Sequence, residues 1–402
     1  MWRGEDASPQ ARLWLRCITA GANAAIRPVG RKWATSFRQE KATGYLQIIE
    51  WLMLRPKFLS SWLAAGGLPC RLLAFFLGLV VGAGGAFAST VEELSVPSTA
   101  LGRPISVSIY RPDGPVPKAG WPVLYLLHGL HGNNRDWPLL GSVRETLDRL
   151  IAAKLIHPMV VVMPDAGNSW YVDSAAVNGP GNYETAMLDD LPQVIEGRFS
   201  PHCQRGSRAI AGLSMGGFGA LRLALTRPDR YVAVASLSGA LWQNIPAAQV
   251  KDGLWRGGNG YFQKIDAETV VRGIDLPPEG AHFGGAFGTP FDARRFNQAN
   301  VFTLLARQVK AQVELPAIYL TVGDKDSHDL WRGSIALFET LMADRVKAEL
   351  RVTDGDHDWA LWRQAIEGAL VFVDSKFSDP LPAMAADPAN NPKFAGGENV
   401  VK

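Results

Sequence analysis

The chain has 402 residues, of which 47% are hydrophobic and 20% are charged, as in a globular protein with a substantial core. Its formal net charge is +3, but residues 1–88 hold 11 basic and four acidic residues, and the rest holds 30 basic and 34 acidic residues. Because the positive charge belongs to this leader, and no basic patch with interleaved aromatic residues follows it, the composition excludes a nucleic-acid partner.

The leader contains an uncharged apolar stretch, LLAFFLGLVVGAGGAF, at residues 72–87. Basic residues precede it, and residues 86–88 form an A-x-A cleavage pattern, which predicts a secretory signal cut before Ser89. Met53 is a candidate for the true start, since the segment from there has ordinary signal dimensions. The stretch is short for a spanning helix, so we expect no permanent membrane span after cleavage; an uncleaved membrane anchor is the alternative.

Cysteine usage agrees with export. Cys17 and Cys70 lie in the leader, which leaves Cys203 in the body of the chain. A single cysteine forms neither an internal disulfide nor a cysteine-rich metal site, so we expect Cys203 to be a structural thiol.

The body begins with two strand-like runs, at residues 91–96 and 105–110, and a loop rich in proline and glycine follows at 111–120. In the second run, Ser106 and Ser108 alternate with apolar residues. This period of two predicts a half-buried strand.

Short, continuous apolar runs follow, and such runs are typical of strands buried on both faces of a parallel sheet. They are Val123–Gly129, Met159–Asp165, Ala209–Gly212, Val232–Gly239 and Ala317–Gly323. Segments with helical periodicity, Arg144–Ala153 and Leu188–Phe199, lie between some of them. The alternation predicts an α/β fold with a mainly parallel central sheet and helices on both faces.

Residues 240–315 depart from this alternation and are rich in glycine and aromatic residues. We expect this segment to leave the sheet and to cover one side of it. Its aromatic residues include Trp242, Trp255, Tyr261, Phe262, Phe283 and Phe287. Residues 379–402 show no periodicity and are predicted to be a disordered tail. The predicted organisation is therefore a leader (1–88), a catalytic α/β domain (89–378) and a tail.

The motif G-x-S-x-G occurs at Gly212–Gly216, between a predicted strand and a predicted helix. In that context it is the nucleophile elbow of the α/β-hydrolase fold, a sharp turn that presents the serine oxygen at the edge of the sheet. Gly212 and Gly216 would remove steric clashes in the turn. The motif predicts Ser214 as the catalytic nucleophile.

A serine hydroxyl needs a base, and the expected chain order is serine, acid, histidine. The histidines after Ser214 are His282, His328 and His357. His357 follows the strand-like run 348–352 in a loop, where a base could reach the elbow. We therefore predict His357 as the base.

The acid should follow the preceding strand, and Asp324, Asp326 and Asp329 all follow the run that ends at Gly323. We favour Asp326, although spacing alone separates it poorly from Asp324.

An oxyanion hole needs two backbone N–H groups. The residue after the nucleophile, Met215, supplies one, and the segment His128-Gly129-Leu130-His131-Gly132 after an early strand supplies the other, at Leu130. We expect His128 and His131 to shape this loop. A metal bound by the two histidines is the alternative, but no third ligand is evident. The predicted chemistry needs no cofactor.

Several motifs together resemble the putative-esterase family of α/β-hydrolases. They are YLLHGLHGNNRDW, PDAGNSWYVD, YETAMLDDLPQVIE, GLSMGGFGALRLAL, SLSGAL, VGDKD and GDHDWALWR, and they span about residues 91–377. The family includes esterase D (S-formylglutathione hydrolase), enterochelin, feruloyl and acetylxylan esterases, and the antigen 85 mycolyltransferases.

The resemblance implies Ser214 as nucleophile, Asp326 rather than Asp324 as acid, and His357 as base, with Leu130 and Met215 as oxyanion donors. It also implies that Asn168, Ser169 and Trp170 lie near the pocket. The residues expected to contact substrate are His131, Trp170, Trp242 and Trp359.

These observations predict an exported serine carboxylesterase that acts through an acyl-enzyme on a small-molecule, carbohydrate or lipid ester. An acyltransferase of the mycolyltransferase type, with the same acyl-enzyme, is the first alternative. Export argues against a hydrolase of cytosolic glutathione thioesters. The presence of all three triad residue types argues against a non-catalytic binding module.

Overall fold

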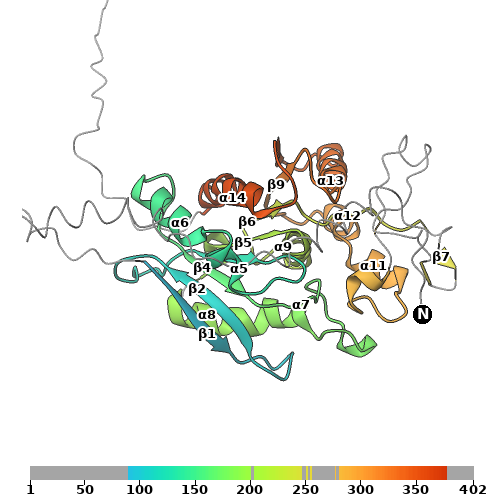
Figure 1. Cartoon of the computed structure of the whole chain (residues 1–402), viewed down its shortest axis with the longest axis horizontal. Helices are drawn as coiled ribbons and strands as arrows, with labels where there is room; N and C mark the ends of the chain where they lie inside the picture. Colours follow the sequence, from blue (N-terminus) through green and yellow to red (C-terminus); the bar gives the residue numbers. More distant parts are fainter. Residues whose placement is uncertain are drawn as a thin grey trace, which may run out of the picture. The chain divides into compact units, whose positions relative to one another are not determined.

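The structure is a computed structural model that describes residues 89–200, 203–246, 250–251, 254–255, 277 and 280–377 (Figure 1). The predicted leader with its cleavage pattern, the predicted tail, and the aromatic residues Tyr261 and Phe262 lie outside the described residues.

An eight-stranded sheet forms the centre of the domain, in the order β1-β2-β4-β3-β5-β6-β9-β10. Its strands are β1 (Thr90–Val96), β2 (Ile105–Arg111), β3 (Val123–Leu127), β4 (Val160–Pro164), β5 (Arg208–Leu213), β6 (Ala233–Leu237), β9 (Ala317–Gly323) and β10 (Ala348–Thr353). Strands β1 and β2, and β2 and β4, pair antiparallel, and every other neighbouring pair is parallel. The continuous apolar runs form the buried parallel strands, which confirms the predicted fold class.

Helices cover both faces of the sheet (Figure 1). One face packs against α6 (Val143–Ala152) and α14 (Trp359–Asp374). The other packs against α8 (Leu191–Phe199), α9 (Met215–Thr226), α12 (Val301–Lys310) and α13 (Trp331–Ala343). Neighbouring residues of β5 face opposite cores, Ile210 on the α9 side and Ala211 on the α14 side, as the twofold period of a strand requires.

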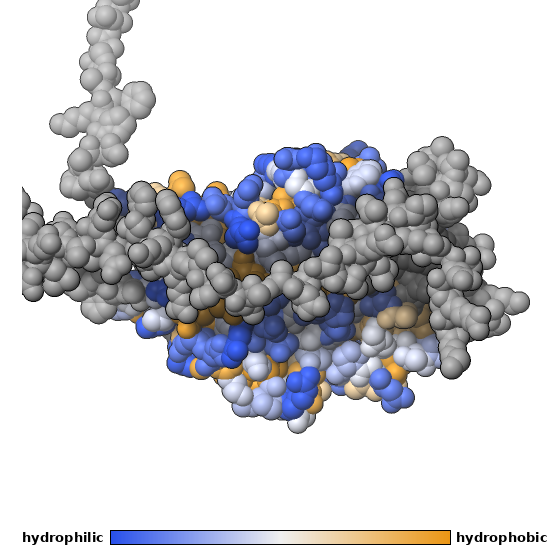
Figure 2. All heavy atoms as spheres, in the orientation of Figure 1, coloured by the Kyte–Doolittle hydropathy of each residue, from blue (hydrophilic) through white to orange (hydrophobic). Residues whose placement is uncertain are grey.

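Shorter elements connect these layers. They are α5 (Asp136–Leu139), η1 (Ala175–Val177), α7 (Tyr183–Thr185), η2 (Ala186–Asp190, a π-helical turn), η3 (Arg205–Ser207), β7 (Val250–Lys251), β8 (Leu254–Trp255), η5 (Gly280–Phe283) and α11 (Ala293–Ala299). Hydrophilic and apolar residues are mixed on the face of the domain that Figure 2 shows. Among the described residues, none of the helices combines the length and the apolar character needed to cross a membrane.

The prediction that β2 is half buried holds at Ser106, which is exposed, but not at Ser108 and Tyr110. Ser108 and Tyr110 are each only 1% exposed, because side chains from other elements satisfy both hydroxyl groups. The Asn134 amide donates to Ser108 Oγ (2.8 Å), and the Tyr110 hydroxyl donates to Asp148 Oδ1 in α6 (2.8 Å). An alternation of apolar residues with serine does not reveal that a helix covers the second face.

Residues 240–315 were expected to act as a cover, and this holds for only part of the segment. Helix α12 packs on α9 and belongs to the same core. Phe283 and Phe287 are buried in a cluster with Phe291 and Phe296, with ring centroids 5.1 Å apart between Phe283 and Phe287. Much of the aromatic content therefore builds core rather than a roof.

Candidate active site

Ser214 occupies the turn between β5 and α9 in a strained backbone conformation, with φ 54° and ψ −120°. Its N–H donates to Leu237 O of β6 (2.9 Å), which ties the turn to the sheet. A Cβ at Gly212 would overlap the Gly216 carbonyl, and one at Gly216 would lie 2.5 Å from the His128 carbonyl oxygen. Glycine is required at both positions because backbone atoms, which cannot rotate away, fill the space.

The structure joins the three predicted triad residues in one chain of hydrogen bonds. His357 Nε2 lies 3.0 Å from Ser214 Oγ, and His357 Nδ1 lies 2.8 Å from Asp326 Oδ2. His357 stands in the loop between β10 and α14, and Asp326 stands in the loop after β9. The two side chains are 8% and 0% exposed. Three loops at the carboxyl end of the sheet therefore converge on one serine.

Burial and direction separate the three candidate acids. Asp326 is buried, and its second oxygen accepts from the His328 N–H (3.0 Å). Asp324 is exposed and accepts from the Gly355 N–H (3.1 Å). Asp329 accepts from the Trp331 indole (3.3 Å). Of these three aspartates, only Asp326 bonds to the His357 side chain.

The other two histidine candidates lie in the wall of the cavity around Ser214. The ring of His328 contacts that of His357 edge-on, with centroids 4.7 Å apart. His282 lies 5.4 Å from the ring of Trp170, and burial lowers the pKa of His282 to about 4. His282 is therefore neutral at physiological pH.

Ser214 opens into a cavity of about 240 Å³. All four residues expected to contact substrate, His131, Trp170, Trp242 and Trp359, line it. Its other lining residues are Gly129, Leu130, Asp136, Leu213, Ser214, Ala240, His282, His328, Leu330, His357 and Trp362. The cavity combines aromatic walls with a few polar groups, as is usual for a small-molecule site.

Two neighbours of Trp170 in the sequence support the cavity from outside. Asn168 accepts from the His131 N–H (2.8 Å) and so anchors the loop that carries His131. Ser169 is fully buried, and its hydroxyl accepts from the Tyr171 N–H (3.1 Å). Neither residue lines the cavity.

The lining residues that the sequence reasoning missed include Asp136 and Trp362. Burial raises the pKa of the Asp136 carboxyl. Trp362 donates to Ser238 Oγ (3.2 Å) and packs edge-on against His357, with centroids 4.9 Å apart. The spacing of Trp359 and Trp362, three residues apart on α14, placed both on one side of that helix and could have revealed the second.

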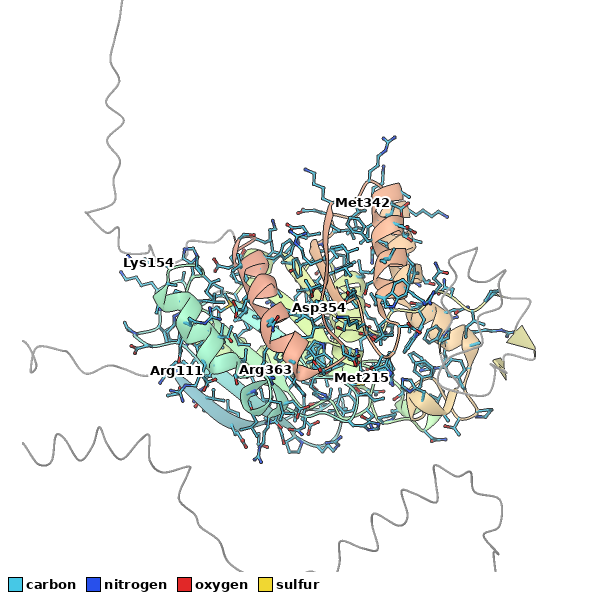
Figure 3. All side chains as sticks on the ribbon, turned by 45° about the horizontal axis from the view of Figure 1, so that its top comes forward. Arg111, Lys154, Met215, Met342, Asp354 and Arg363 are labelled. Atoms are coloured by element: carbon cyan, nitrogen blue, oxygen red, sulfur yellow. The ribbon has the colours of Figure 1, made fainter. Side chains whose placement is uncertain are left out.

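The two expected oxyanion donors border the serine. Met215, labelled in Figure 3, is the first residue of α9, whose N-terminal dipole favours negative charge. On the other side, a Cβ at Gly129 would lie 3.3 Å from Ser214 Cβ, so the backbone before Leu130 passes beside the serine. Within the described residues, neither the Leu130 nor the Met215 N–H donates to a protein acceptor.

His128 shapes this loop, as expected. The residue is 1% exposed, and both ring nitrogens bond to backbone groups, Nδ1 to Gly129 O (2.7 Å) and Nε2 to the Ala166 N–H (2.9 Å). Neither nitrogen is left for a metal, which removes the basis of the metal alternative at His128 and His131.

Comparison with known proteins agrees with this architecture. Esterase Rv1288 of Mycobacterium tuberculosis is 32% identical over 209 residues, which are 47% of this chain and 43% of that protein. The diacylglycerol acyltransferase/mycolyltransferase Ag85A of the same species is 30% identical over 222 residues, 52% of this chain and 62% of the relative. The chain therefore spans less than half of the first of these relatives.

The fold is that of solved esterases. A ferulic acid esterase structure superposes with a TM-score of 0.55 at 24% identity, covering 72% of this chain and all of that one. The family description "Putative esterase" matches residues 98–373, more than two thirds of the chain. The relatives include one protein named an esterase and one named a diacylglycerol acyltransferase/mycolyltransferase. The chain is a member of the Putative esterase family of α/β-hydrolases.

Proposed function

We propose that residues 89–378 form a serine carboxylesterase that works through an acyl-enzyme, with no cofactor. The observation that carries this proposal is the continuous hydrogen-bond chain from Ser214 Oγ through His357 to the buried Asp326. In such a chain the carboxylate holds the imidazole in the tautomer whose free nitrogen faces the hydroxyl.

The first half-reaction acylates the enzyme. Nε2 of His357 takes the Ser214 proton while Oγ attacks the ester carbonyl carbon. The negative charge that develops on the carbonyl oxygen is held by the N–H groups of Leu130 and Met215. When the C–O bond to the alcohol breaks, His357 returns the proton to the leaving alcohol. Asp326 stays ionised and stabilises the imidazolium formed in between.

The second half-reaction releases the acid. His357 takes a proton from water, the hydroxide attacks the acyl carbon, and the same two N–H groups hold the oxyanion. Ser214 leaves with the proton from His357, which restores the resting enzyme. His131, Trp170, Trp242 and Trp359 would hold the ester, since all four line the cavity.

Hydrolysis of p-nitrophenyl esters tests the proposal. Replacing Ser214 by alanine should abolish turnover and leave the folded state intact, whereas Ser327→Ala, at an exposed serine of the acid loop, should leave turnover unchanged. Normal hydrolysis by Ser214→Ala would refute the assignment. A panel of short-chain, long-chain and feruloyl esters would then identify the acyl group.

Acyl transfer to a sugar or alcohol is the second candidate, favoured by the 30% identity to a mycolyltransferase. Both reactions share the acyl-enzyme, so they differ only in whether water or a hydroxyl acceptor enters the cavity. Product analysis with a sugar in the reaction separates them: a new sugar ester indicates transfer, and free acid alone indicates hydrolysis.

We also propose that the enzyme is exported. The support is the apolar stretch at 72–87 with the A-x-A pattern before Ser89. N-terminal sequencing of protein recovered outside the cytoplasm should begin at Ser89. An intact leader in the membrane fraction would favour the anchored alternative.

A further inference from the structure

The peptide group between Gly129 and Leu130 is held at its carbonyl end. The Gly129 oxygen lies 2.7 Å from His128 Nδ1 and accepts a second hydrogen bond from the Gly132 N–H (3.1 Å). In a trans peptide the C=O and the following N–H point in opposite directions. Whatever fixes the Gly129 carbonyl therefore also fixes the direction of the Leu130 N–H.

The partners of His128 determine where its proton sits. The Ala166 N–H can only donate, so Nε2, 2.9 Å away, must accept and carry no proton. The Gly129 carbonyl can only accept, so Nδ1 must carry the proton. Burial lowers the pKa of His128 and keeps the ring in this neutral form.

Two further features place the ring and the peptide relative to Ser214. The Tyr171 hydroxyl donates to the His128 carbonyl (2.9 Å), which fixes the backbone at the end of β3. A Cβ at Gly129 would lie 3.3 Å from Ser214 Cβ, and Gly129, Leu130 and Ser214 line the same cavity. The fixed carbonyl points toward His128, which does not line this cavity. The Leu130 N–H points in the opposite direction and can therefore face the cavity.

We propose that His128 is a positioning residue for the oxyanion hole: by holding the Gly129 carbonyl it aims the Leu130 N–H at the carbonyl oxygen of the substrate. This inference rests on the proposed acyl-enzyme chemistry. Glycine at 129 leaves the peptide able to rotate once the His128 bond is lost and only the longer bond from the Gly132 N–H remains. A rotated peptide would present its oxygen to the oxyanion. Removing the histidine should therefore weaken transition-state binding more than substrate binding.

The test compares His128→Phe with Tyr125→Phe. The first keeps an aromatic ring but loses both side-chain bonds. The second lies on β3, three residues before His128, and removes the hydrogen bond of a buried tyrosine to Glu196 Oε1 (2.9 Å) while leaving the Gly129 carbonyl untouched. Removing one oxyanion donor outright costs about 10²–10³-fold in kcat. We expect kcat to fall by about 10²-fold in His128→Phe with KM changed by less than about 3-fold, and kcat in Tyr125→Phe to stay within about 3-fold.

A trifluoromethyl ketone, which adds to the serine and forms an oxyanion, supplies a second readout. Its affinity should fall in parallel with kcat in His128→Phe, while the affinity for a carboxylic acid product stays unchanged. A folded His128→Phe enzyme with kcat within about 3-fold of the wild type would overturn the proposal. So would equal losses of kcat in His128→Phe and Tyr125→Phe, because these would indicate only damaged structure.

The wild-type protein gives a test that does not depend on folding of a variant. Nitrogen NMR of histidine-labelled protein should show a buried histidine protonated at Nδ1 only, and protonation at Nε2 would overturn the proposal. Failure of the proposed function has a different signature: the wild-type enzyme itself would neither turn over esters nor bind the trifluoromethyl ketone.

Discussion

The two sides of the proposed oxyanion hole are built in different ways. On one side, Met215 follows a turn whose shape is set by the backbone itself, with Ser214 at φ 54° and with backbone atoms filling the space beside Gly212. On the other side, Leu130 follows a loop held by hydrogen bonds from His128 to Gly129 and from Ala166 to His128.

This difference determines how each side responds to change. The shape of the elbow depends on steric exclusion by main-chain atoms, so even a small added side chain would overlap them. The His128 loop depends on a few directed bonds, so losing one side chain changes the direction of a donor without displacing the chain. The elbow is therefore expected to fail by unfolding, and the loop by losing activity. The proposed triad chemistry depends on both sides.

Removing the base should have the largest effect. His357→Ala should lower kcat by about 10⁴- to 10⁶-fold, because nothing then accepts the serine proton. Both oxyanion donors remain, so a residual rate of about 10³-fold over the uncatalysed reaction should persist. Steady-state kinetics on a p-nitrophenyl ester measures both. A variant without any rate above background would mean that the two donors contribute nothing on their own.

Removing the acid should have the next largest effect. Asp326→Asn should lower kcat by about 10⁴-fold, since the amide no longer holds His357 in the productive tautomer. Asp324→Asn is the matched control, two residues away in the same loop and exposed, and it should change kcat by less than about 3-fold. Equal losses in the two variants would remove Asp326 from the triad.

Adding a methyl group at Gly212 or at Gly129 compares the elbow directly with the His128 loop. Gly212→Ala should destabilise folding by about 3 kcal/mol, because its Cβ meets the Gly216 backbone. Gly129→Ala should cost less, about 1 kcal/mol, because the nearest atom is the Leu213 side chain, 2.7 Å away and able to rotate. In α8, Gly197→Ala has nothing within 4 Å and should stabilise by up to about 1 kcal/mol.

Urea unfolding of the three glycine variants measures these differences. An equal cost at Gly212 and Gly129 would contradict the contrast between a backbone-filled turn and a loop held by side chains.

A further effect on folding stability concerns pH. Burial lowers the pKa of His282 from 6.5 to about 4. Between these values the unfolded chain binds a proton at His282 and the folded chain does not, so folding stability rises with pH across this window. The loss on going from pH 7 to pH 5 should be about 2 kcal/mol. In His282→Phe that contribution should vanish; an unchanged slope of stability against pH would show that His282 does not titrate this way.

The sequence predicted those parts of the site that local pattern determines. The elbow follows from Gly212, Ser214 and Gly216 within five residues, and continuous apolar runs indicated the parallel strands. The choice between Asp324 and Asp326 could not come from spacing, since both follow the same strand and only the direction of each side chain separates them. The family resemblance selected Asp326, and the structure places that side chain against His357.

Features that depend on partners far away along the chain could not be predicted from the sequence. The environment of His128 involves Ala166 and Tyr171, which are 38 and 43 residues away. Burial of the second face of β2 depends on α6. The packing of α12 on α9 was not predicted, because α12 lies in residues 240–315, which were expected to form a cover. In each case, a residue's neighbours in space rather than in sequence decide its role.

The central claim is that His357 and Asp326 turn Ser214 into a nucleophile. The most direct measurement is covalent labelling by a fluorophosphonate probe, with the modified peptide identified by mass spectrometry. The account predicts a single adduct on Ser214, fast in the wild-type protein and slowed by orders of magnitude in His357→Ala. Labelling of another residue, or equal labelling rates in the two proteins, would contradict it.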